Sequence, residues 1–397
     1  MLFLHNMDEL INNQKNLELE LQRIKNELVI LYEVSNAMLT TLKLEEILYI
    51  TLTGITAHSG LGFNRAMLFL IDEKNNILEG RMGIGPDNAE EAGHIWHQIE
   101  SQKLDLEDLI NNFRSSNPLG KSHLNHTIKH IRVPLSQEEG GILALALLDG
   151  MPLHVTKELF NLRENDPLLH TIHSQDFVTA PLKSKDKTIG LIVADNMFTK
   201  KPITKDDIRL LTMLTNQAAL AIENSRLYEQ TLIHAHTDSL TNLWNHGFFQ
   251  DKLEEKLSEA ENRNSPLSIL MIDLDDFKPY NDKLGHQKGD QLLVKIATII
   301  KETFRREDFV CRYGGEEFVI IMPDTHKSKA YEFAENIRKI IADYPLPHED
   351  ILPGKKQTIS IGIATCPEDG QHKSTLIDHA DRALYEAKRK GKNRIYG

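Results

Sequence analysis

The chain has 397 residues, which is too long for one ordinary domain and predicts two or three. Hydrophobic residues make up 40% of it and charged residues 26%, as is usual for a globular protein in water. The formal net charge of −12 argues against general affinity for nucleic acid or for an anionic membrane surface. A single basic or metal-binding pocket could still take a nucleotide.

The cysteines and the apolar runs indicate the compartment. The only two cysteines, Cys311 and Cys366, form no CxxC pair, so a disulfide framework is not expected and a reducing compartment fits. No apolar run reaches the roughly 18 residues of a membrane span. The N-terminus also lacks the basic and apolar regions of a signal peptide. We therefore expect a cytoplasmic protein without a membrane segment.

Residues 1–45 are expected to form a coiled-coil helix. Apolar residues there recur in alternating steps of four and three, a period that is typical of a seam between two helices. The length of the repeat favours a helix that pairs with a second copy of the chain, and an amphipathic helix packed on its own domain is the alternative. The seam consists of Leu10, Gln14, Leu17, Leu21, Ile24, Leu28, Leu31, Ser35, Met38 and Leu42.

Residues 46–205 change to short β-like runs that are separated by turn residues. The segment KSKDK (183–187) lies between the last two runs and is expected to be a hairpin loop. The expected strands are RAMLFLID (65–72), KHIRVPL (129–135), GILALALLDG (141–150), FVTAPL (177–182) and TIGLIVADN (188–196).

A second long helix is expected over residues 206–237. Thr204 and Asp207 have the spacing of a capping box, and neither Gly nor Pro follows for the next seven turns. Its apolar and small residues again alternate threes and fours, and the small ones would let two such helices approach closely. These residues are Leu211, Leu214, Ala218, Ala221, Ser225, Tyr228 and Leu232.

Order and content here resemble a GAF sensor domain over about residues 46–230, with the domain proper at 46–205 and the following helix as a signalling linker. The resemblance rests on PLKSKDKTIGLIVADN and ITKDDIRLLTMLTNQAALAIENSRLYE, which look like the closing strands and exit helix of that family. It implies a pocket over a sheet for a small molecule or a protein, and it leaves the ligand unknown.

Histidines in this region are candidate metal ligands. His123, His126 and His130 have spacings of three and four, which could place them on one face of a helix, and His94 and His97 are treated alike. Surface histidines in contact with solvent are the favoured interpretation over a metal or haem site. No cysteine in the region could supply a thiolate.

Residues 238–397 alternate β and α patterns in the order β-α-β-β-α-β, which predicts a ferredoxin-like sheet. In that arrangement the first and third strands lie side by side and antiparallel, so the end of the first, at Asp273, meets the start of the third, at Glu316. The expected strands cover 265–277, 308–313, 316–323 and 357–366, and the expected helices cover 290–304, 328–344 and 379–391.

The sequence RYGGEEF places two glycines directly before two acids. Gly314 and Gly315 form a tight hairpin that lets the backbone approach a ligand. Glu316 and Glu317 are adjacent and are expected to point to opposite faces of a strand, so one can join Asp273 in binding a divalent ion. Two oxygen ligands with open positions suit Mg²⁺. A hairpin with solvated acids at its tip is the alternative.

Four motifs in order resemble the GGDEF family of diguanylate cyclases over about residues 238–397. They are the opening segment TDSLTNLWNHGFF, the run from Asp273 to Asp290, RYGGEEF and ALYEAKRKGKNRI. The resemblance implies that Asp273 and Glu316 bind Mg²⁺, with Mn²⁺ as a possible substitute, aided by the carbonyl of Leu274. It implies that Glu317 helps to activate the attacking 3′-hydroxyl.

The resemblance also implies the substrate contacts. Asn281 and Asp290 would recognise guanine, and an acid suits the donor edge of that base. Two departures from the family pattern are Lys392 and Asn245-His246-Gly247. Lys392 stands where Arg is common, so the charge is kept and bidentate geometry is lost. Asn-Arg-Arg is common at the second position, so this departure puts a local structural salt bridge in doubt and leaves the chemistry unaffected. The remaining substrate-binding residues would be Phe277, Gly314 and Gly315 near the nucleotide, and Lys278, Lys388 and Lys392 at the phosphates.

The reaction implied is the condensation of two GTP into cyclic di-GMP and two pyrophosphates, with two domains facing each other in a homodimer. The N-terminal and linker helices would hold that dimer, and a sensor ligand would change it. Arg305 and Asp308 match the family's inhibitory R-x-x-D site for the product. The alternatives are a GTP or cyclic di-GMP receptor, a cyclase with a different base preference, and a sensor scaffold.

Overall fold

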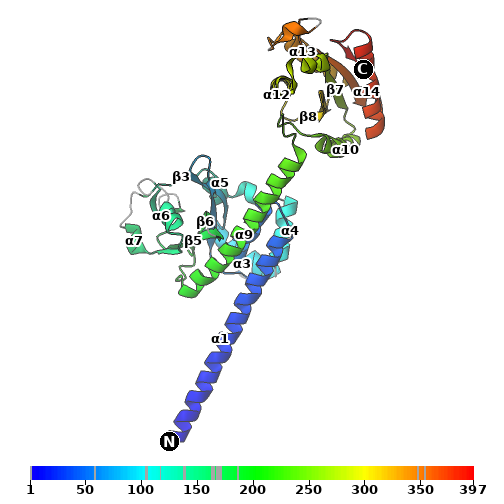
Figure 1. The fold of residues 1–397 in the computed structure, drawn as a ribbon. Coiled ribbons are helices and arrows are strands. Elements are labelled where there is room, and N and C mark those ends of the chain that lie inside the picture. Colours follow the sequence, from blue (N-terminus) through cyan, green and yellow to red (C-terminus); the bar gives the residue numbers. More distant parts are fainter. Residues whose placement is uncertain are drawn as a thin grey trace. The chain divides into compact units, whose positions relative to one another are not determined.

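The structure is a computed structural model, and it describes residues 2–57, 60–102, 106–116, 118–136, 140–161, 166, 172–185, 187–346, 348–352 and 355–397. The chain divides into two compact units, Met1–Glu229 and Gln230–Gly397, which are described separately as the N-terminal and the C-terminal unit (Figure 1). Within the described residues, no helix is long and apolar enough to cross a membrane.

The described part of the N-terminal unit is built on a six-stranded sheet in the order β3-β2-β1-β6-β5-β4, in which every neighbouring pair is antiparallel. The strands are β1 (Arg65–Asp72), β2 (Ile77–Ile84), β3 (Arg132–Pro134), β4 (Leu153–Val155), β5 (Phe177–Ser184) and β6 (Lys187–Asp195). The helices are α1 (Leu2–Leu39), α2 (Leu44–Thr56), α3 (Ala89–Gln102), α4 (Leu106–Ser116), α5 (His123–Lys129), α6 (Gly141–Asp149), α7 (Lys157–Asn161) and α9 (Lys205–His236).

Apolar side chains cover both faces of this sheet. On one face α2, α9 and the end of α1 pack against alternate residues of β1 and β6, such as Leu68 and Ile192. On the other face α5 and α6 pack against the intervening residues, such as Phe69 and Leu191. The alternation follows from the two-residue period of a strand. It explains why these strands are apolar almost throughout and why their runs are visible in the sequence.

The prediction of a strand at 141–150 is wrong, because this segment forms helix α6. Gly141 and Gly150 have φ of +59° and +61°, so the apolar run is bounded by two left-handed residues. Five of its residues are buried, and a short run that is buried on most sides carries no periodicity that separates a helix from a strand. Strand β2, with its mixed polar sequence, is not among the predicted strands.

Both predicted long helices exist, but which of their apolar residues are buried and which are exposed differs from the prediction. The capping box at the start of α9 is confirmed, since Thr204 Oγ1 accepts from the Asp207 amide at 3.2 Å. The seam predicted between two copies of α9 is wrong over most of its length, because it lies in the core of its own unit. The buried seam residues are Leu211, Leu214, Ala218, Ala221 and Ser225. The exposed apolar residues include Met213, Leu220 and Leu227, seven positions apart.

The two parts of helix α1 differ in the burial of their apolar side chains. Its last turns pack on the N-terminal unit through Val34 and Met38, which are almost fully buried. Earlier turns leave apolar side chains exposed in the single chain. These are Leu17, Leu21, Ile24 and Leu28. The amphipathic alternative therefore applies to the end of the helix, and the earlier turns keep a stripe that a second helix could cover.

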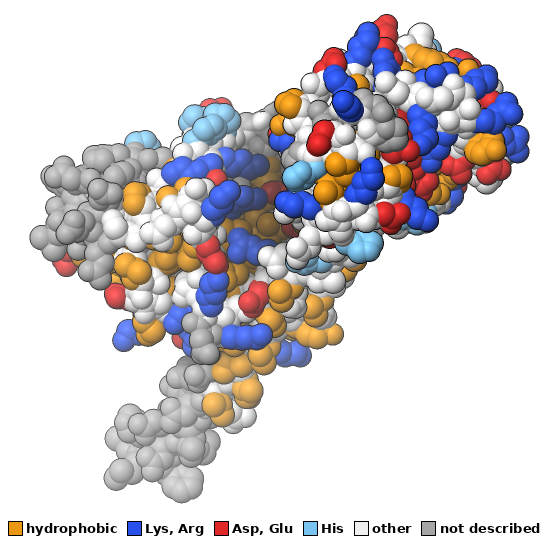
Figure 2. Space-filling view, turned by 45° about the horizontal axis from the view of Figure 1, so that its top comes forward, with side chains coloured by type: hydrophobic (Ala, Val, Ile, Leu, Met, Phe, Trp, Pro, Cys, Tyr) orange, Lys and Arg blue, Asp and Glu red, His pale blue; other side chains and the backbone are white. Residues whose placement is uncertain are grey.

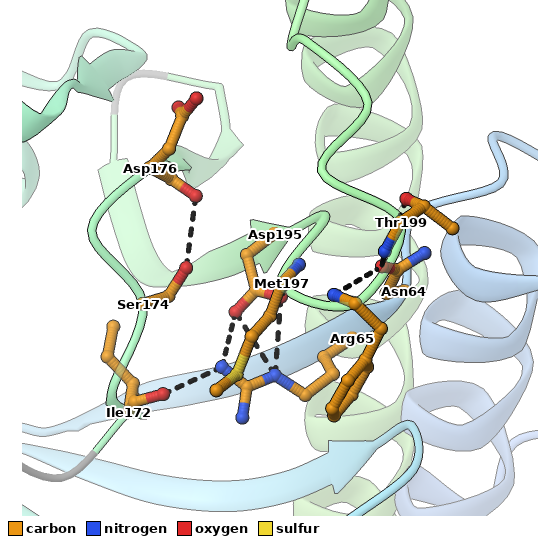
Figure 3. Close-up of polar contacts among 9 residues, drawn as sticks. Asn64, Arg65, Ile172, Ser174, Asp176, Asp195, Met197 and Thr199 are labelled. Atoms are coloured by element: carbon orange, nitrogen blue, oxygen red, sulfur yellow. Dashed lines mark hydrogen bonds and ion pairs between the residues drawn. The ribbon is translucent and has the colours of Figure 1, made fainter. Parts of the chain in front are cut away.

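A buried ion pair fixes the segment between β6 and α9 (Figure 3). The guanidinium of Arg65 donates to both carboxylate oxygens of Asp195, at 2.6 to 3.2 Å, and to the carbonyl of Ile172 at 2.7 Å. Asn64 Oδ1 accepts from the amide of Thr199 at 2.8 Å. The cluster therefore ties the segment directly after β6 to the start of β1. Removing one member of such a buried pair would leave an uncompensated charge.

The C-terminal unit, in its described residues, contains a five-stranded sheet in the order β11-β10-β7-β9-β8, with β7 antiparallel to both β9 and β10. Helices α12 and α13 cover one face, and α10 and α14 cover the other. The ferredoxin-like prediction is confirmed. Its elements are α10 (His246–Arg263), β7 (Leu267–Leu274), α11 (Phe277–Leu284), α12 (His286–Thr303), β8 (Phe309–Gly314), β9 (Glu317–Pro323), α13 (Lys327–Asp343), β10 (Ile359–Cys366), α14 (Lys373–Arg389) and β11 (Ile395–Tyr396).

Candidate active site

The end of β7 and the start of β9 meet at one edge of the C-terminal sheet. The register pairs Asp273 directly with Glu317, and the amide of Leu274 donates to the carbonyl of Glu316 at 3.3 Å. The predicted meeting of these two strand ends is therefore confirmed. The prediction that both glutamates lie in the strand is wrong for Glu316, because β9 begins at Glu317 and Glu316 belongs to the turn.

The glycine turn leaves open space at this edge. Gly315 has φ of +50°, a conformation that side chains disfavour. A Cβ atom placed on Gly314 or on Gly315 would meet no protein atom within 4 Å. Packing inside the protein thus gives no reason for a glycine at Gly314. The space over the turn is what a ligand that lies against the backbone requires.

Arg312 holds the turn in place. Its Nε and Nη2 donate to the carbonyl of Gly315 at 3.1 and 2.7 Å, and its Nη1 donates to Asp238 at 3.0 Å. Thr241 also donates to Asp238, at 2.7 Å. The opening segment is therefore fixed to the turn by this ion pair, although the chain has no arginine at 246 or 247. Neither Arg312 nor Asp238 is among the predicted site residues, and only their place within the motifs could have indicated them.

The acids at this edge share one nearby ammonium group. Lys388 Nζ lies 2.6 Å from Oδ2 of Asp273, whose side chain is 7% exposed. Burial, with repulsion from Asp275, raises the pKa of Asp273 above its usual value although the Lys388 ammonium acts to lower it. Burial, followed by repulsion from Asp273, likewise raises the pKa values of Glu316 and Glu317. Carboxylates that are partly buried and repel one another bind cations readily, because a cation offsets that repulsion.

The donor set fits a hard divalent ion that takes part of its coordination from a substrate. Among the described residues, no three His, Cys, Asp or Glu side chains are placed to hold a metal by themselves. Asp273, Glu316 and the Leu274 carbonyl offer two carboxylates and one carbonyl oxygen at an open edge. Mg²⁺ commonly binds to one or two carboxylates and completes its shell with water and phosphate oxygens, so these residues fit it.

The predicted base-binding residues lie where α11 meets α12. Oδ1 of Asn281 is buried and, among the described residues, has no hydrogen-bond partner. It lies against Gly289, where a Cβ atom would come within 1.7 Å of it. Asp290 follows on the next position of α12 and is exposed, as is Lys278, whereas Phe277 is buried and anchors α11. A buried acceptor without a donor suits the N–H groups of guanine.

Two of the three lysines predicted to bind phosphate, Lys388 and Lys392, form ion pairs with acids in this structure. Lys392 Nζ lies 2.6 Å from Asp276, which begins α11 in a left-handed conformation. Asp275 is an important residue that the sequence prediction missed. It is buried and accepts from Thr358, from Ser360 and from the amide of Asn393, at 2.7 to 2.9 Å. It thereby ties the end of β7 to the segment that carries Lys392.

Arg305 and Asp308 form a bidentate pair after α12. Arg305 donates to the two carboxylate oxygens of Asp308 at 3.0 and 2.6 Å and to Thr325 at 2.9 Å. The Asp308 side chain is fully buried, and the Arg305 side chain is 33% exposed. In this arrangement Asp308 orients Arg305, and only Arg305 is accessible to a ligand.

The five candidate histidines lie on the surface of the N-terminal unit. His123, His126 and His130 are exposed, and the rings of the last two are 4.5 Å apart. His94 and His97 are exposed on α3.

A cavity of about 480 Å³ lies between α2, α4 and α5 of the N-terminal unit and contains an ion pair, Arg114 to Glu46 at 3.0 Å. Its lining also includes Lys43, Glu45, Met82, Phe113, Leu119, Gly120, Asn125 and Lys129.

Known families match both units. Residues 235–394 match the family model described as the diguanylate cyclase GGDEF domain, and residues 43–222 match the GAF domain. Diguanylate cyclase A of Treponema denticola is 38% identical over 221 residues, which are 54% of this chain and 57% of that protein. Diguanylate cyclase TpbB of Pseudomonas aeruginosa is 39% identical over 179 residues, or 44% of this chain and 39% of that protein.

Among solved structures, the coiled coil and GGDEF domain of DgcB from Caulobacter crescentus in complex with c-di-GMP is 33% identical. The match covers 46% of this chain and 96% of that one, with a TM-score of 0.42. The chain spans less than two thirds of the curated relatives named above, 57% of one and 39% of the other. The chain therefore contains a GAF domain over residues 43–222 and, following it, a GGDEF domain over residues 235–394.

Proposed function

We propose that the protein condenses two molecules of GTP into cyclic di-GMP and two pyrophosphates. One observation carries the proposal. Asp273 is paired with Glu317 across β7 and β9, beside a Gly-Gly turn with open space above it. This places paired acids next to a surface that a nucleotide can approach. The family match of the same residues and the names of the relatives support the same reaction.

The roles of the acids follow from their positions. Asp273, Glu316 and the Leu274 carbonyl would hold Mg²⁺ or Mn²⁺, which supplies charge neutralisation at the phosphates and a more acidic 3′-hydroxyl when bound. Glu317, whose pKa is raised by burial and by nearby acids, would accept the proton of that hydroxyl. The 3′-oxygen then forms a bond to the α-phosphorus of the second GTP, and the bond from that phosphorus to pyrophosphate breaks.

The remaining residues would position GTP. Asn281 and Asp290 would accept hydrogen bonds from guanine, and the buried orphan oxygen of Asn281 supports this role. Lys278, Lys388 and Lys392 would contact the phosphates after the last two leave their acidic partners. Accurate positioning supplies much of the rate in such transfers, because the enzyme itself provides little covalent chemistry.

Two chains would act together, since each C-terminal unit would hold one GTP and each 3′-oxygen must reach the other nucleotide. A two-fold homodimer meets this requirement. The exposed apolar stripes of the two long helices support such a dimer. The stripe of α1 belongs to the predicted seam, whereas the stripe of α9 consists of other residues than its predicted seam. The stripes are Leu17, Leu21, Ile24 and Leu28 of α1, and Met213, Leu220 and Leu227 of α9.

Regulation is part of the same proposal. A ligand of the GAF domain would change the dimer through α9, whose buried residues pack in the core of the N-terminal unit. Cyclic di-GMP would inhibit the enzyme by binding the accessible guanidinium of Arg305, with Asp308 orienting that group. Because the reaction consumes GTP, we place the protein in the cytoplasm.

The test is to incubate the purified full chain with GTP, with Mg²⁺ in one sample and with excess chelator in a second, and to identify products by mass. The proposal predicts cyclic di-GMP and pyrophosphate in a ratio of one to two, only with the metal. Unchanged GTP, or hydrolysis to GDP, would contradict it. ATP in place of GTP is the matched control and should give no cyclic dinucleotide.

A further inference from the structure

The ammonium group of Lys388 lies among the acids of the site. Its Nζ is 2.6 Å from Asp273 Oδ2, and its side chain is 36% exposed, compared with 7% for Asp273. The same ammonium lowers the pKa values of Glu316 and Glu317, although burial and the other acids raise them further. One cationic side chain thus compensates three carboxylates at the edge where β7 meets β9.

Among the described residues of that edge, Lys388 is the basic side chain in direct contact with Asp273, and Lys392 acts on that acid only from a distance. Lys392 is 2.6 Å from Asp276, on the segment after β7. Lys390 Nζ lies 3.8 Å from a carboxylate oxygen of Glu386 and 4.2 Å from the centre of the Tyr396 ring. Lys388 therefore holds the position in which a cation is most needed.

A divalent ion and this ammonium would compete for the same oxygen atoms. Mg²⁺ binds carboxylate oxygens at about 2.0–2.1 Å, which is closer than the Lys388 contact of 2.6 Å. Two cations that share one partly buried carboxylate repel each other strongly, because the protein screens charge less than water does. The lysine stem is flexible, so its ammonium can move away while the carboxylates stay in place.

We propose that Lys388 occupies the position of the divalent cation in the nucleotide-free protein, and that the metal–GTP complex displaces it onto a phosphate oxygen. This inference rests on the proposed function and adds to it an order of binding. Free metal binds weakly, because it must displace an ammonium that then has no partner. Metal that arrives with GTP brings a new anionic partner for Lys388, so the exchange loses no ion pair.

The test measures Mn²⁺ alone, without nucleotide, by electron paramagnetic resonance of the full chain. Lys388→Gln removes the charge and keeps most of the length of the side chain, and it should bind Mn²⁺ more tightly by about 5- to 150-fold, the usual range for coupled sites. Lys388→Arg keeps the charge, so its binding of Mn²⁺ should stay as weak as that of the wild type. Lys390→Gln is the matched control on the same helix and should bind Mn²⁺ like the wild type. A thermal unfolding scan of each variant confirms that it folds.

Asp273→Asn separates the failure of this inference from a failure of the proposed function. If wild type and Lys388→Gln bind Mn²⁺ equally and Asp273→Asn binds none, the metal uses this site without displacing Lys388, and the inference is overturned while the function stands. If Asp273→Asn binds as well as the wild type, the acids do not hold the metal, and the metal site of the proposed function fails. Tighter binding in Lys388→Gln that disappears in the double variant with Asp273→Asn supports the exchange.

Discussion

Gly289→Ala separates the structural role of a helix residue from its role in nucleotide binding. Alanine in place of glycine within a helix is expected to stabilise that helix by up to about 1 kcal/mol. In α12, however, the new Cβ would lie 1.7 Å from Asn281 Oδ1 and 2.7 Å from its Cγ. Contacts that short cannot persist, so the Asn281 side chain must rotate away from the position that the proposed function assigns to guanine.

The magnitude follows from the hydrogen bonds at risk. Asn281 would lose about two hydrogen bonds to the base, worth about 1–3 kcal/mol together, which weakens GTP binding by about 5- to 150-fold. The unfolding free energy should meanwhile change by less than about 1 kcal/mol, because the helix gain offsets the local rearrangement. Weaker binding in a protein of unchanged stability is an outcome that general damage does not produce.

The assay is calorimetric titration with a non-hydrolysable GTP analogue in Mg²⁺, together with thermal unfolding. Gly93→Ala is the control, since it also lies in a helix but its Cβ would meet nothing within 4 Å. A double-mutant cycle with Asn281→Ala completes the test. The two substitutions should be strongly non-additive, because both remove the same contact. Wild-type affinity in Gly289→Ala, or simple additivity in the cycle, would refute the reasoning.

Three further substitutions examine the base, the turn and the product site. Asp290→Ser should raise the use of ATP relative to GTP in mixed-nucleotide assays, because a hydrogen-bonding acid discriminates strongly between bases, and an unchanged preference would place recognition elsewhere. Arg312→Lys keeps the charge but loses the fork that reaches both Gly315 and Asp238, so kcat should fall about 10-fold and the unfolding free energy by about 1–2 kcal/mol in denaturant titrations. Arg305→Lys keeps a charge beside buried Asp308 but loses planar recognition, so progress curves with added cyclic di-GMP should slow less than those of the wild type. Equal slowing would remove Arg305 from the product site.

Strand order is the part of the C-terminal unit that the sequence predicts best. Four apolar runs and two helical patterns in the order β-α-β-β-α-β require the ends of the first and third strands to meet. The observed meeting of these two strand ends follows from that topology, whereas the register that pairs Asp273 with Glu317 does not. The position of Glu316 in the turn could not be predicted to one residue, because strand ends depend on the local hydrogen bonds of the hairpin.

Side-chain pairing is what the sequence could not show. Lys388 is separated from Asp273 by more than a hundred positions, and nothing in its helix pattern distinguishes a phosphate ligand from the partner of an acid. Asp308 resembles a ligand in its motif but is buried beside Arg305. Such choices depend on distances between elements that only the folded chain defines.

The N-terminal unit shows a different limit. Leu214 and Ala218 have the spacing of a seam between helices, yet the sheet of their own unit buries them. A helix that packs on a sheet and a helix that packs on a partner present nearly the same period. The segment 141–150 fails for a related reason, because an apolar run bounded by glycines suits either a buried strand or the buried helix α6.

The most direct measurement of the central claim compares cyclic di-GMP formation by the wild type and by Asp273→Asn, with GTP and Mg²⁺, using mass to identify the product. Loss of this charged ligand at the edge of the sheet should lower the rate at least about 100-fold. Asp251→Asn, an exposed acid on α10, is the control and should keep the wild-type rate. Turnover near the wild-type level in folded Asp273→Asn would contradict the assignment of this edge as the site of cyclic di-GMP synthesis.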